Sequence, residues 1–230
     1  MYGQTELLSV LRGKATRCST LAGLRLMCYI QGGAGGAQED KMTMAKVLQS
    51  NLNRSHTAQL LLPQIADELD ADILILCEQY RDKTIPTWFS SLSATAAIWI
   101  RGGSLNRISE HGAGDDFVWA KVGAITYVSV YLTPNCTVGE FEYKLSLLED
   151  ALRTRQGHVV VAGDFNARAI EWGMTMTNKR GRLLLEMAAR LDLVVANTGN
   201  TSTYRRPGYG NSIPDVTFTT DGIYSQIRRW

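Results

Sequence analysis

Short apolar runs alternate along the chain with longer segments in which apolar positions recur every three or four residues. The runs are rich in β-branched side chains, which favour strands, and the longer periodicity is typical of amphipathic helices. Three consecutive valines at 159–161 indicate a strand buried on both faces of its sheet. The pattern predicts strands at 45–54, 73–77, 96–100, 117–121, 125–131, 159–161 and 193–196, and helices at 56–69, 139–153 and 181–191.

This alternation of strands and helices predicts an α/β fold with parallel strand pairing. Strand 45–54, helix 56–69 with Ser55 as its N-cap, and strand 73–77 form one such unit. Polar residues that follow the two strands of the unit should therefore lie at one edge of one sheet. Near the end of the chain, 202–217 predicts two strands joined by a loop that carries glycine, arginine and tyrosine.

Composition indicates a globular protein without a strong overall charge. The 230 residues suffice for one sizeable domain, with 45% hydrophobic residues and a formal net charge of +2. A nucleic-acid partner would therefore have to be held by a local patch. The glycine-rich break at 32–36 divides the chain into an extension or linker, 1–42, and a single domain, 43–230.

Cysteine spacing and hydropathy bear on the kind of site and on the cellular compartment. The four cysteines are scattered without CxxC spacing, which argues against a zinc site or a disulfide scaffold. They are typical of a reducing compartment, and we expect a nuclear or intracellular protein. No apolar run approaches the length of a transmembrane helix, so a membrane partner is not expected.

Polar side chains follow the predicted strands, where α/β proteins usually place their ligand sites. Alone, each is more simply a turn or surface residue, because Gly, Asp and Asn dominate turns. Six of them along one chain are harder to explain that way. They are Asn51, Glu78, Tyr131, Asp164, Asn166 and Asp215.

The kinds of residue in this set favour one chemistry. No Ser/His/Asp or Cys/His nucleophile set is present, which argues against acyl transfer. Carboxylates suit a hard cation such as Mg²⁺ (or Mn²⁺), and Asp164 can take a proton from water. Asn and Tyr side chains can donate to developing charge on a phosphate oxygen. The set therefore predicts metal-assisted hydrolysis of a phosphate ester.

Five segments resemble, in order, the motifs of the exonuclease–endonuclease–phosphatase superfamily. They are 51–53, 75–79, 131–135, Gly163-Asp164-Phe165-Asn166 and Ser212-Ile213-Pro214-Asp215. Further segments at 172–173, 178–184, 197–199 and 203–204 are similar to the apurinic-type endonuclease domain of non-LTR (LINE-type) retrotransposons. The resemblance covers roughly 46–220. It implies a four-layer α/β sandwich, two packed β-sheets flanked by helices.

The resemblance also implies roles for the six residues. Glu78 would bind the divalent metal, Mg²⁺ or Mn²⁺, and Asp164 would orient or deprotonate the attacking water with help from Asn51. Asn166 and Tyr131 would bind the scissile phosphate. Thr203 would line the site, and Asp215 would hold a catalytic histidine.

That histidine belongs to a Ser-Asp-His motif which these 230 residues do not contain. The histidines present, His56, His111 and His158, match no family motif and are expected to be structural or solvated. We therefore expect a C-terminal strand of the sandwich to be missing and the nicking activity to be weak or absent. The reverse transcriptase region of a parent polyprotein is also absent.

DNA is the expected partner, contacted by residues near the site. The candidates are Arg168, Thr203, Arg205, Arg206 and Tyr209, of which the last four lie in or beside the predicted hairpin. Two alternatives stay open: a phosphoesterase of the same superfamily that acts on a different substrate, and an inactive relic that binds nucleic acid without cutting it.

Overall fold

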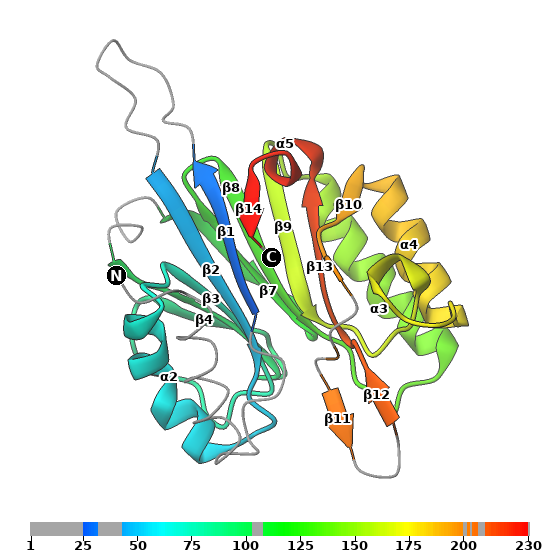
Figure 1. Ribbon diagram of the computed structural model, residues 1–230, viewed down its shortest axis with the longest axis horizontal. Coiled ribbons are helices and arrows are strands. Elements are labelled where there is room, and N and C mark those ends of the chain that lie inside the picture. The colour runs from blue at the N-terminus through cyan, green and yellow to red at the C-terminus, as the bar shows by residue number, and fades with distance from the viewer. Residues whose placement is uncertain are drawn as a thin grey trace.

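The computed structural model describes residues 25–31, 43–102, 108–199, 202, 204–206 and 210–229. Two six-stranded β-sheets pack face to face, and helices cover their outer faces (Figure 1). A two-stranded ribbon stands apart from both sheets. This four-layer α/β sandwich is the predicted fold.

The first sheet has the strand order β14-β1-β2-β3-β5-β4. Strands β2 and β3 pair in parallel through the predicted crossover helix, α2 (His56–Glu68), and the other neighbours are antiparallel. The strands are β1 (Arg25–Gln31), β2 (Thr43–Asn51), β3 (Ile73–Cys77), β4 (Trp88–Ser90), β5 (Ala96–Ile100) and β14 (Ile227–Arg229).

The second sheet has the order β10-β13-β9-β8-β7-β6. Its parallel pair is β8 with β9, joined by α3 (Val138–Arg153), and the other pairs are antiparallel. The strands are β6 (Ile108–Ala113), β7 (Phe117–Val122), β8 (Ile125–Tyr131), β9 (His158–Asp164), β10 (Leu193–Val195) and β13 (Asp215–Thr220).

Three helical elements and a separate β-ribbon also lie between β9 and β14 in the sequence. The 3-10 helix η2 (Ile170–Trp172) and helix α4 (Lys179–Arg190) follow β9, and the short α5 (Asp221–Tyr224) follows β13. Strands β11 (Tyr204–Arg206) and β12 (Gly210–Ser212) form the separate ribbon, which leads through Ile213 and Pro214 into β13. The ribbon therefore lies at the end of the sandwich where β13 begins (Figure 1).

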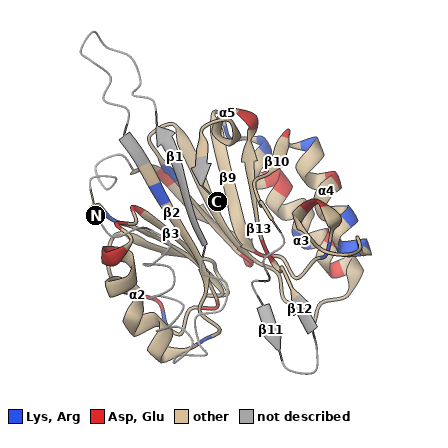
Figure 2. Ribbon diagram, in the orientation of Figure 1, with Lys and Arg blue, Asp and Glu red and all other residues tan. Residues whose placement is uncertain are grey.

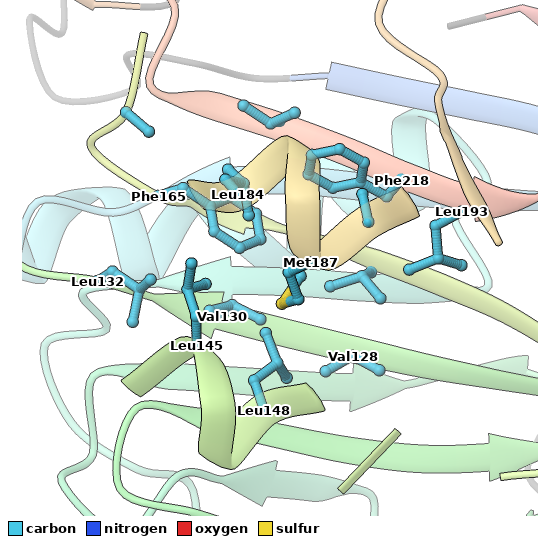
Figure 3. Close-up of a cluster of buried hydrophobic side chains, with 14 of the residues drawn as sticks. Val128, Val130, Leu132, Leu145, Leu148, Phe165, Leu184, Met187, Leu193 and Phe218 are labelled. Atoms are coloured by element: carbon cyan, nitrogen blue, oxygen red, sulfur yellow. The ribbon is translucent and has the colours of Figure 1, made fainter. Parts of the chain in front are cut away.

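The hydrophobic core has three parts, one between the sheets and one under each helical layer. Side chains such as Ile75, Ile98 and Val160 fill the space between the sheets. Helix α2 covers the first sheet over Leu48, Leu74 and neighbouring side chains. Helices α3 and α4 cover the second sheet, as Figure 3 shows for a cluster that includes Val130, Leu145, Phe165, Met187 and Phe218.

The local signals for the helices act as expected. The Ser55 hydroxyl accepts a hydrogen bond from the Ala58 amide and caps α2. Thr137 and Glu140 form a reciprocal capping box at the start of α3. Helix α2 continues through Pro63. In the described part of the chain, no helix is long and apolar enough to cross a membrane.

Several elements were not predicted. Strand β1 lies within 1–42, treated above as an extension, and it pairs with β2 along seven residue pairs. Strand β14 pairs with β1, so the last described element occupies the edge of the first sheet. The domain boundary at 42–43 and the missing C-terminal strand remain predictions.

Gly163 serves strand packing rather than a turn. It lies within β9 and is not among the described glycines with positive φ. A Cβ atom at this position would lie 1.9 Å from the carbonyl oxygen of Val130 on β8. Glycine is therefore needed for the close approach of β8 and β9.

Candidate active site

The end of β9 brings three site candidates together in the second sheet. Tyr131, the last residue of β8, pairs with Asp164 in the parallel ladder, and Asp215 pairs with Asp164 from the other side. Asp215 was predicted near a strand end but is the first residue of β13. Because β13 runs antiparallel to β9, its start lies at the same edge as the end of β9.

The first sheet supplies two more candidates at its facing edge. Asn51 ends β2 and pairs with Cys77 at the end of β3, so Glu78 follows directly beside it. Glu78 has a φ of 50°, in the left-handed region that side chains other than glycine rarely occupy. Its carbonyl oxygen accepts a hydrogen bond of 2.7 Å from the Arg54 amide. Strained backbone held by its surroundings is typical of functional sites.

Two hydrogen bonds between side chains join the sheets at this edge. The Asn51 Nδ2 donates to Asp164 Oδ2 at 2.8 Å, and the Tyr131 hydroxyl donates to Glu78 Oε1 at 2.9 Å. Four of the six predicted residues are therefore in direct contact in pairs. The parallel strands of two different sheets end at one place, and the sequence pattern had indicated a shared edge for Asn51 and Glu78 of the first sheet.

Asn166 is fixed by its backbone and by one side-chain bond. It has a φ of 47°, and its amide donates to Asp164 Oδ1 at 3.1 Å. Its Nδ2 donates to the carbonyl oxygen of Leu132 at 3.0 Å. Since a side-chain amide carries two N–H groups, the second can still serve a phosphate oxygen. Asn166 thus connects the segments that follow β8 and β9.

Burial sets the protonation of the site. It raises the pKa of Asp164 to about 6, while hydrogen bonds from Asn51 and from the Asn166 amide oppose the rise. Burial and the neighbouring Glu78 raise the pKa of Tyr131 above its ordinary value, so its hydroxyl keeps its proton as a donor. A carboxylate with a pKa near 6 is suited to take a proton from water close to neutral pH.

Supporting residues that the sequence did not reveal lie behind these groups. The Gln49 side chain donates to the Gly163 carbonyl at 3.2 Å and accepts from the Thr217 hydroxyl at 2.8 Å, across the two sheets. Asn197 binds the backbone of β13 through the Asp215 carbonyl and the Thr217 amide. The one available signal was a polar Gln49 in an otherwise apolar alternation.

The three histidines of the chain make contacts elsewhere. The His56 ring packs against Tyr80 at 5.0 Å, and the His111 ring packs against Phe89 at 4.5 Å. His158 begins β9, at the opposite end of the strand from Asp164, and its Nδ1 lies 3.2 Å from the Thr220 hydroxyl. His111 lies on β6.

The DNA-binding candidates are only partly described. Thr203 and Tyr209 lie outside the described residues. The predicted hairpin is confirmed, but Arg205 and Arg206, expected in its loop, lie on strand β11, where they pair with Asn211 and Gly210. The side chain of Arg168 is exposed, two residues beyond Asn166. In Figure 2 both signs of charge are mixed on the outer helices α3 and α4, and the strands carry few charges.

The donors at the site fit a hard divalent cation bound partly by its substrate. Among the described residues, no group of three or more His, Cys, Asp or Glu side chains could hold a metal by itself. Mg²⁺ is commonly bound through one or two carboxylates together with substrate phosphates and waters. Glu78 can supply such a carboxylate, because Tyr131 bonds only to its Oε1 and the other carboxylate oxygen takes no part in that bond.

The fold and the residues at this edge are similar to those of the exonuclease–endonuclease–phosphatase superfamily. Residues 125–230 match the family described as endonuclease-reverse transcriptase, and that range includes Tyr131, Asp164, Asn166 and Asp215. No curated protein matches the sequence.

A solved structure extends the likeness to most of the chain. The endonuclease domain of TRAS1, a telomere-specific non-LTR retrotransposon, superposes with a TM-score of 0.66 at 25% sequence identity. The match covers 79% of this chain and 87% of the TRAS1 domain. The resemblance to non-LTR retrotransposon endonuclease domains is thereby confirmed, and the fold is one of that superfamily.

Proposed function

We propose that this chain is a metal-dependent DNA endonuclease that nicks target DNA for retrotransposon insertion. The observation that carries the proposal is the pair of cross-sheet hydrogen bonds, Asn51 to Asp164 and Tyr131 to Glu78. They bring together at one edge the base Asp164, the metal ligand Glu78 and Tyr131, a hydrogen-bond donor for a phosphate oxygen. The match to the endonuclease-reverse transcriptase family supports DNA as the substrate.

The residues divide the work of hydrolysis among them. Asp164, oriented by Asn51, takes the proton of the attacking water, for which its raised pKa is suited. Asn166 donates a hydrogen bond to a phosphate oxygen, whose charge grows in the transition state. The protonated Tyr131 has a single O–H, which bonds to Glu78 before DNA binds, and it would donate to the phosphate by turning away from Glu78. Asn166 is held in place before substrate arrives, because its backbone amide bonds to Asp164 and its side chain bonds to the Leu132 carbonyl.

Glu78 would hold the metal, with Mg²⁺ or Mn²⁺ as the expected ion. When bound, such an ion neutralises phosphate charge and helps to acidify a water molecule. The Tyr131 hydroxyl fixes one oxygen of Glu78 and leaves the other for the ion. Glu78→Ala should therefore abolish metal-dependent activity.

DNA would be bound by residues that surround the site at this edge of the two sheets. We propose phosphate contacts for Arg168, and contacts in a DNA groove for Arg205, Arg206 and Tyr209 of the β11–β12 hairpin, with Thr203 lining the site. We accordingly propose that the protein acts in the nucleus, or elsewhere inside the cell.

We further propose that these 230 residues, assayed by themselves, nick slowly. All three histidines of the chain have packing or hydrogen-bond partners away from the Asn51–Asp164 pair. Without a histidine as acid or charge donor, the rate should fall by about 10²- to 10⁴-fold. Asp215, the residue expected to hold such a histidine, is buried in the ladder beside Asp164.

A plasmid-nicking assay tests the function. Supercoiled DNA is incubated with excess protein in Mg²⁺ or in EDTA, beside Glu78→Ala and the matched surface control Glu142→Ala. Slow nicking that needs Mg²⁺, survives Glu142→Ala and disappears in Glu78→Ala is expected. Fast turnover would overturn the proposed slowness alone. DNA binding with no nicking above the Glu78→Ala level would favour a relic that binds without cutting.

A further inference from the structure

The first turn of α4 is tied to the loop that follows β8. Arg180 Nη1 donates to the Thr133 carbonyl at 3.3 Å, and Nη2 donates to the carbonyl oxygens of Pro134, at 3.0 Å, and Cys136. The guanidinium also lies over the buried Phe141 ring, 5.2 Å from its centre. Its polar edge is thus occupied by backbone oxygens. We call residues 133–136 the β8 loop.

The same turn is tied to the segment that follows β9. Asn178, the N-cap of α4, accepts hydrogen bonds from the Arg168 and Gly181 amides and donates its own amide to the Arg168 carbonyl. A Cβ atom on Gly181 would lie 1.9 Å from that carbonyl, so helix and segment are in close backbone contact. The start of α4 therefore holds both segments that leave the site edge.

These two segments adjoin the residues that are proposed to donate hydrogen bonds to phosphate oxygens. Tyr131 and Leu132 directly precede the β8 loop, and Asn166 lies two residues before Arg168. The Leu132 carbonyl accepts the Asn166 side-chain bond, and the Leu132 amide donates to the Asp164 carbonyl at 2.9 Å. A displacement of the β8 loop would thus move the acceptor that orients Asn166.

We propose that Arg180 is a positioning residue for phosphodiester hydrolysis, acting through the β8 loop and Leu132 on Asn166. The inference rests on the proposed endonuclease function. It separates Arg180 from the exposed Arg168, which comes from the same region of sequence and has a side chain free to meet DNA. The donors of an arginine are spread over a rigid plane and can reach three separated carbonyls, whereas the three donors of a lysine all leave one nitrogen atom.

Salt dependence distinguishes the two arginines. A side chain that neutralises one DNA phosphate contributes about 0.9 to the slope of log affinity against log salt concentration. Arg168→Ala should therefore reduce the slope by about one, and Arg180→Ala should leave it unchanged. Arg180→Ala should instead lower kcat by about 10²-fold with little change in KM, as expected for a displaced catalytic group.

Hydrogen exchange tests the same inference without catalysis. The Asn166 amide, bonded to Asp164 Oδ1, reports on the site. In Arg180→Ala this amide and the β8 loop should exchange at least about tenfold faster, while the buried strand β3 exchanges as in the parent. Adding millimolar guanidinium to Arg180→Ala should restore slow exchange, and sodium at equal ionic strength should not.

Each outcome bears on one proposal only. Unchanged exchange at Asn166, or a salt slope reduced as in Arg168→Ala, would overturn the positioning role. If the parent chain does not nick DNA, the endonuclease proposal fails on that result, and the exchange measurement still decides the role of Arg180. Arg180→Lys serves where Arg180→Ala unfolds, and it should show the same faster exchange at Asn166.

Discussion

The side-chain amide of Asn51 donates a 2.8 Å hydrogen bond to Asp164 Oδ2, across two β-sheets and 113 residues of sequence. Asn51 ends the parallel strand of one sheet and Asp164 ends the parallel strand of the other. The bond therefore depends on the two sheets packing in this register. It orients the carboxylate and lowers its affinity for protons, which burial would otherwise raise further.

Removing this bond should make Asp164 harder to ionise. Asn51→Ala deletes a donor to the charged carboxylate, so the pKa of Asp164 should rise above its value of about 6. Carbon-13 NMR titration of aspartate carboxyl groups in metal-free protein measures this directly. Asn135→Ala, on an exposed residue of the β8 loop, should leave the titration of Asp164 where it is. A lower pKa in Asn51→Ala would contradict the role of the bond.

The stability of the fold should carry a matching pH dependence. The pKa of Asp164 rises from 3.8 to about 6 on folding, so the folded state binds the proton more tightly than the unfolded chain. The contribution of Asp164 to the free energy of unfolding should therefore fall as pH increases from about 4 to about 6, by on the order of 3 kcal/mol. Urea unfolding of the parent and of Asp164→Asn in EDTA isolates this contribution. A stability difference between the two that does not vary with pH would refute it.

The glycine in β9 offers a test of sheet geometry. Gly163→Ala would place a methyl group 1.9 Å from the Val130 carbonyl, and backbone on both strands would have to move. We expect a loss of about 3 kcal/mol in the free energy of unfolding. Gly139→Ala is the matched control, because nothing lies within 4 Å of the new methyl group in α3. That variant should gain roughly 0.5 to 1 kcal/mol from its helix preference.

Helices α3 and α4 are joined by an ion pair around a largely buried carboxylate. Glu149 accepts from Arg190 Nε at 2.9 Å and from Arg190 Nη2 at 2.8 Å, and also pairs with Arg153. Because both arginines are half exposed, Glu149→Gln should cost only about 1 to 2 kcal/mol. The control is Asp70→Asn, which removes the surface ion pair between Asp70 and Lys46. It should change the free energy of unfolding by less than about 0.5 kcal/mol.

The stability that the ion pairs of Glu149 contribute should decrease in acid. Hydrogen bonds from Arg190, and then from Arg153, hold the pKa of Glu149 below its ordinary value of 4.5. A lowered carboxyl pKa contributes stability above the ordinary value, and that contribution is lost as pH falls through the folded-state value. The gap in melting temperature between the parent and Glu149→Gln should therefore narrow below pH 4.5. A gap that widens there would contradict the assignment.

The buried part of the fold could be predicted because its signal is local. Strands such as 73–77, 96–100 and 125–131 were predicted at their observed bounds, since short and largely apolar runs of this kind are typical of buried strands. Edge strands gave weaker signals. Strand β6 is half exposed, with the sequence ISEHGA, and β4 has only three residues. Their formation depends on neighbouring strands rather than on their own pattern.

The site, too, could be predicted only in part. Polar residues after buried strands identified Asn51, Glu78, Asp164 and Asn166, because strand ends are visible in sequence. Partner choice was not visible. That Gln49 bonds to Gly163 and Thr217, or that Arg180 bonds to the β8 loop rather than facing DNA, follows from how two sheets and a helix pack. No motif near these residues records such long-range contacts.

The most direct test of the account is a double-mutant cycle on DNA nicking by Asn51 and Asp164. Single-turnover rates are measured with excess protein and Mg²⁺ for the parent, Asn51→Ala, Asp164→Asn and the double variant. If the two residues act as one unit, the double variant should lose no more than the slower single variant, at about 10²- to 10⁴-fold. Losses that multiply would show that Asn51 and Asp164 act independently, and nicking unaffected by Asp164→Asn would contradict an active site at this edge.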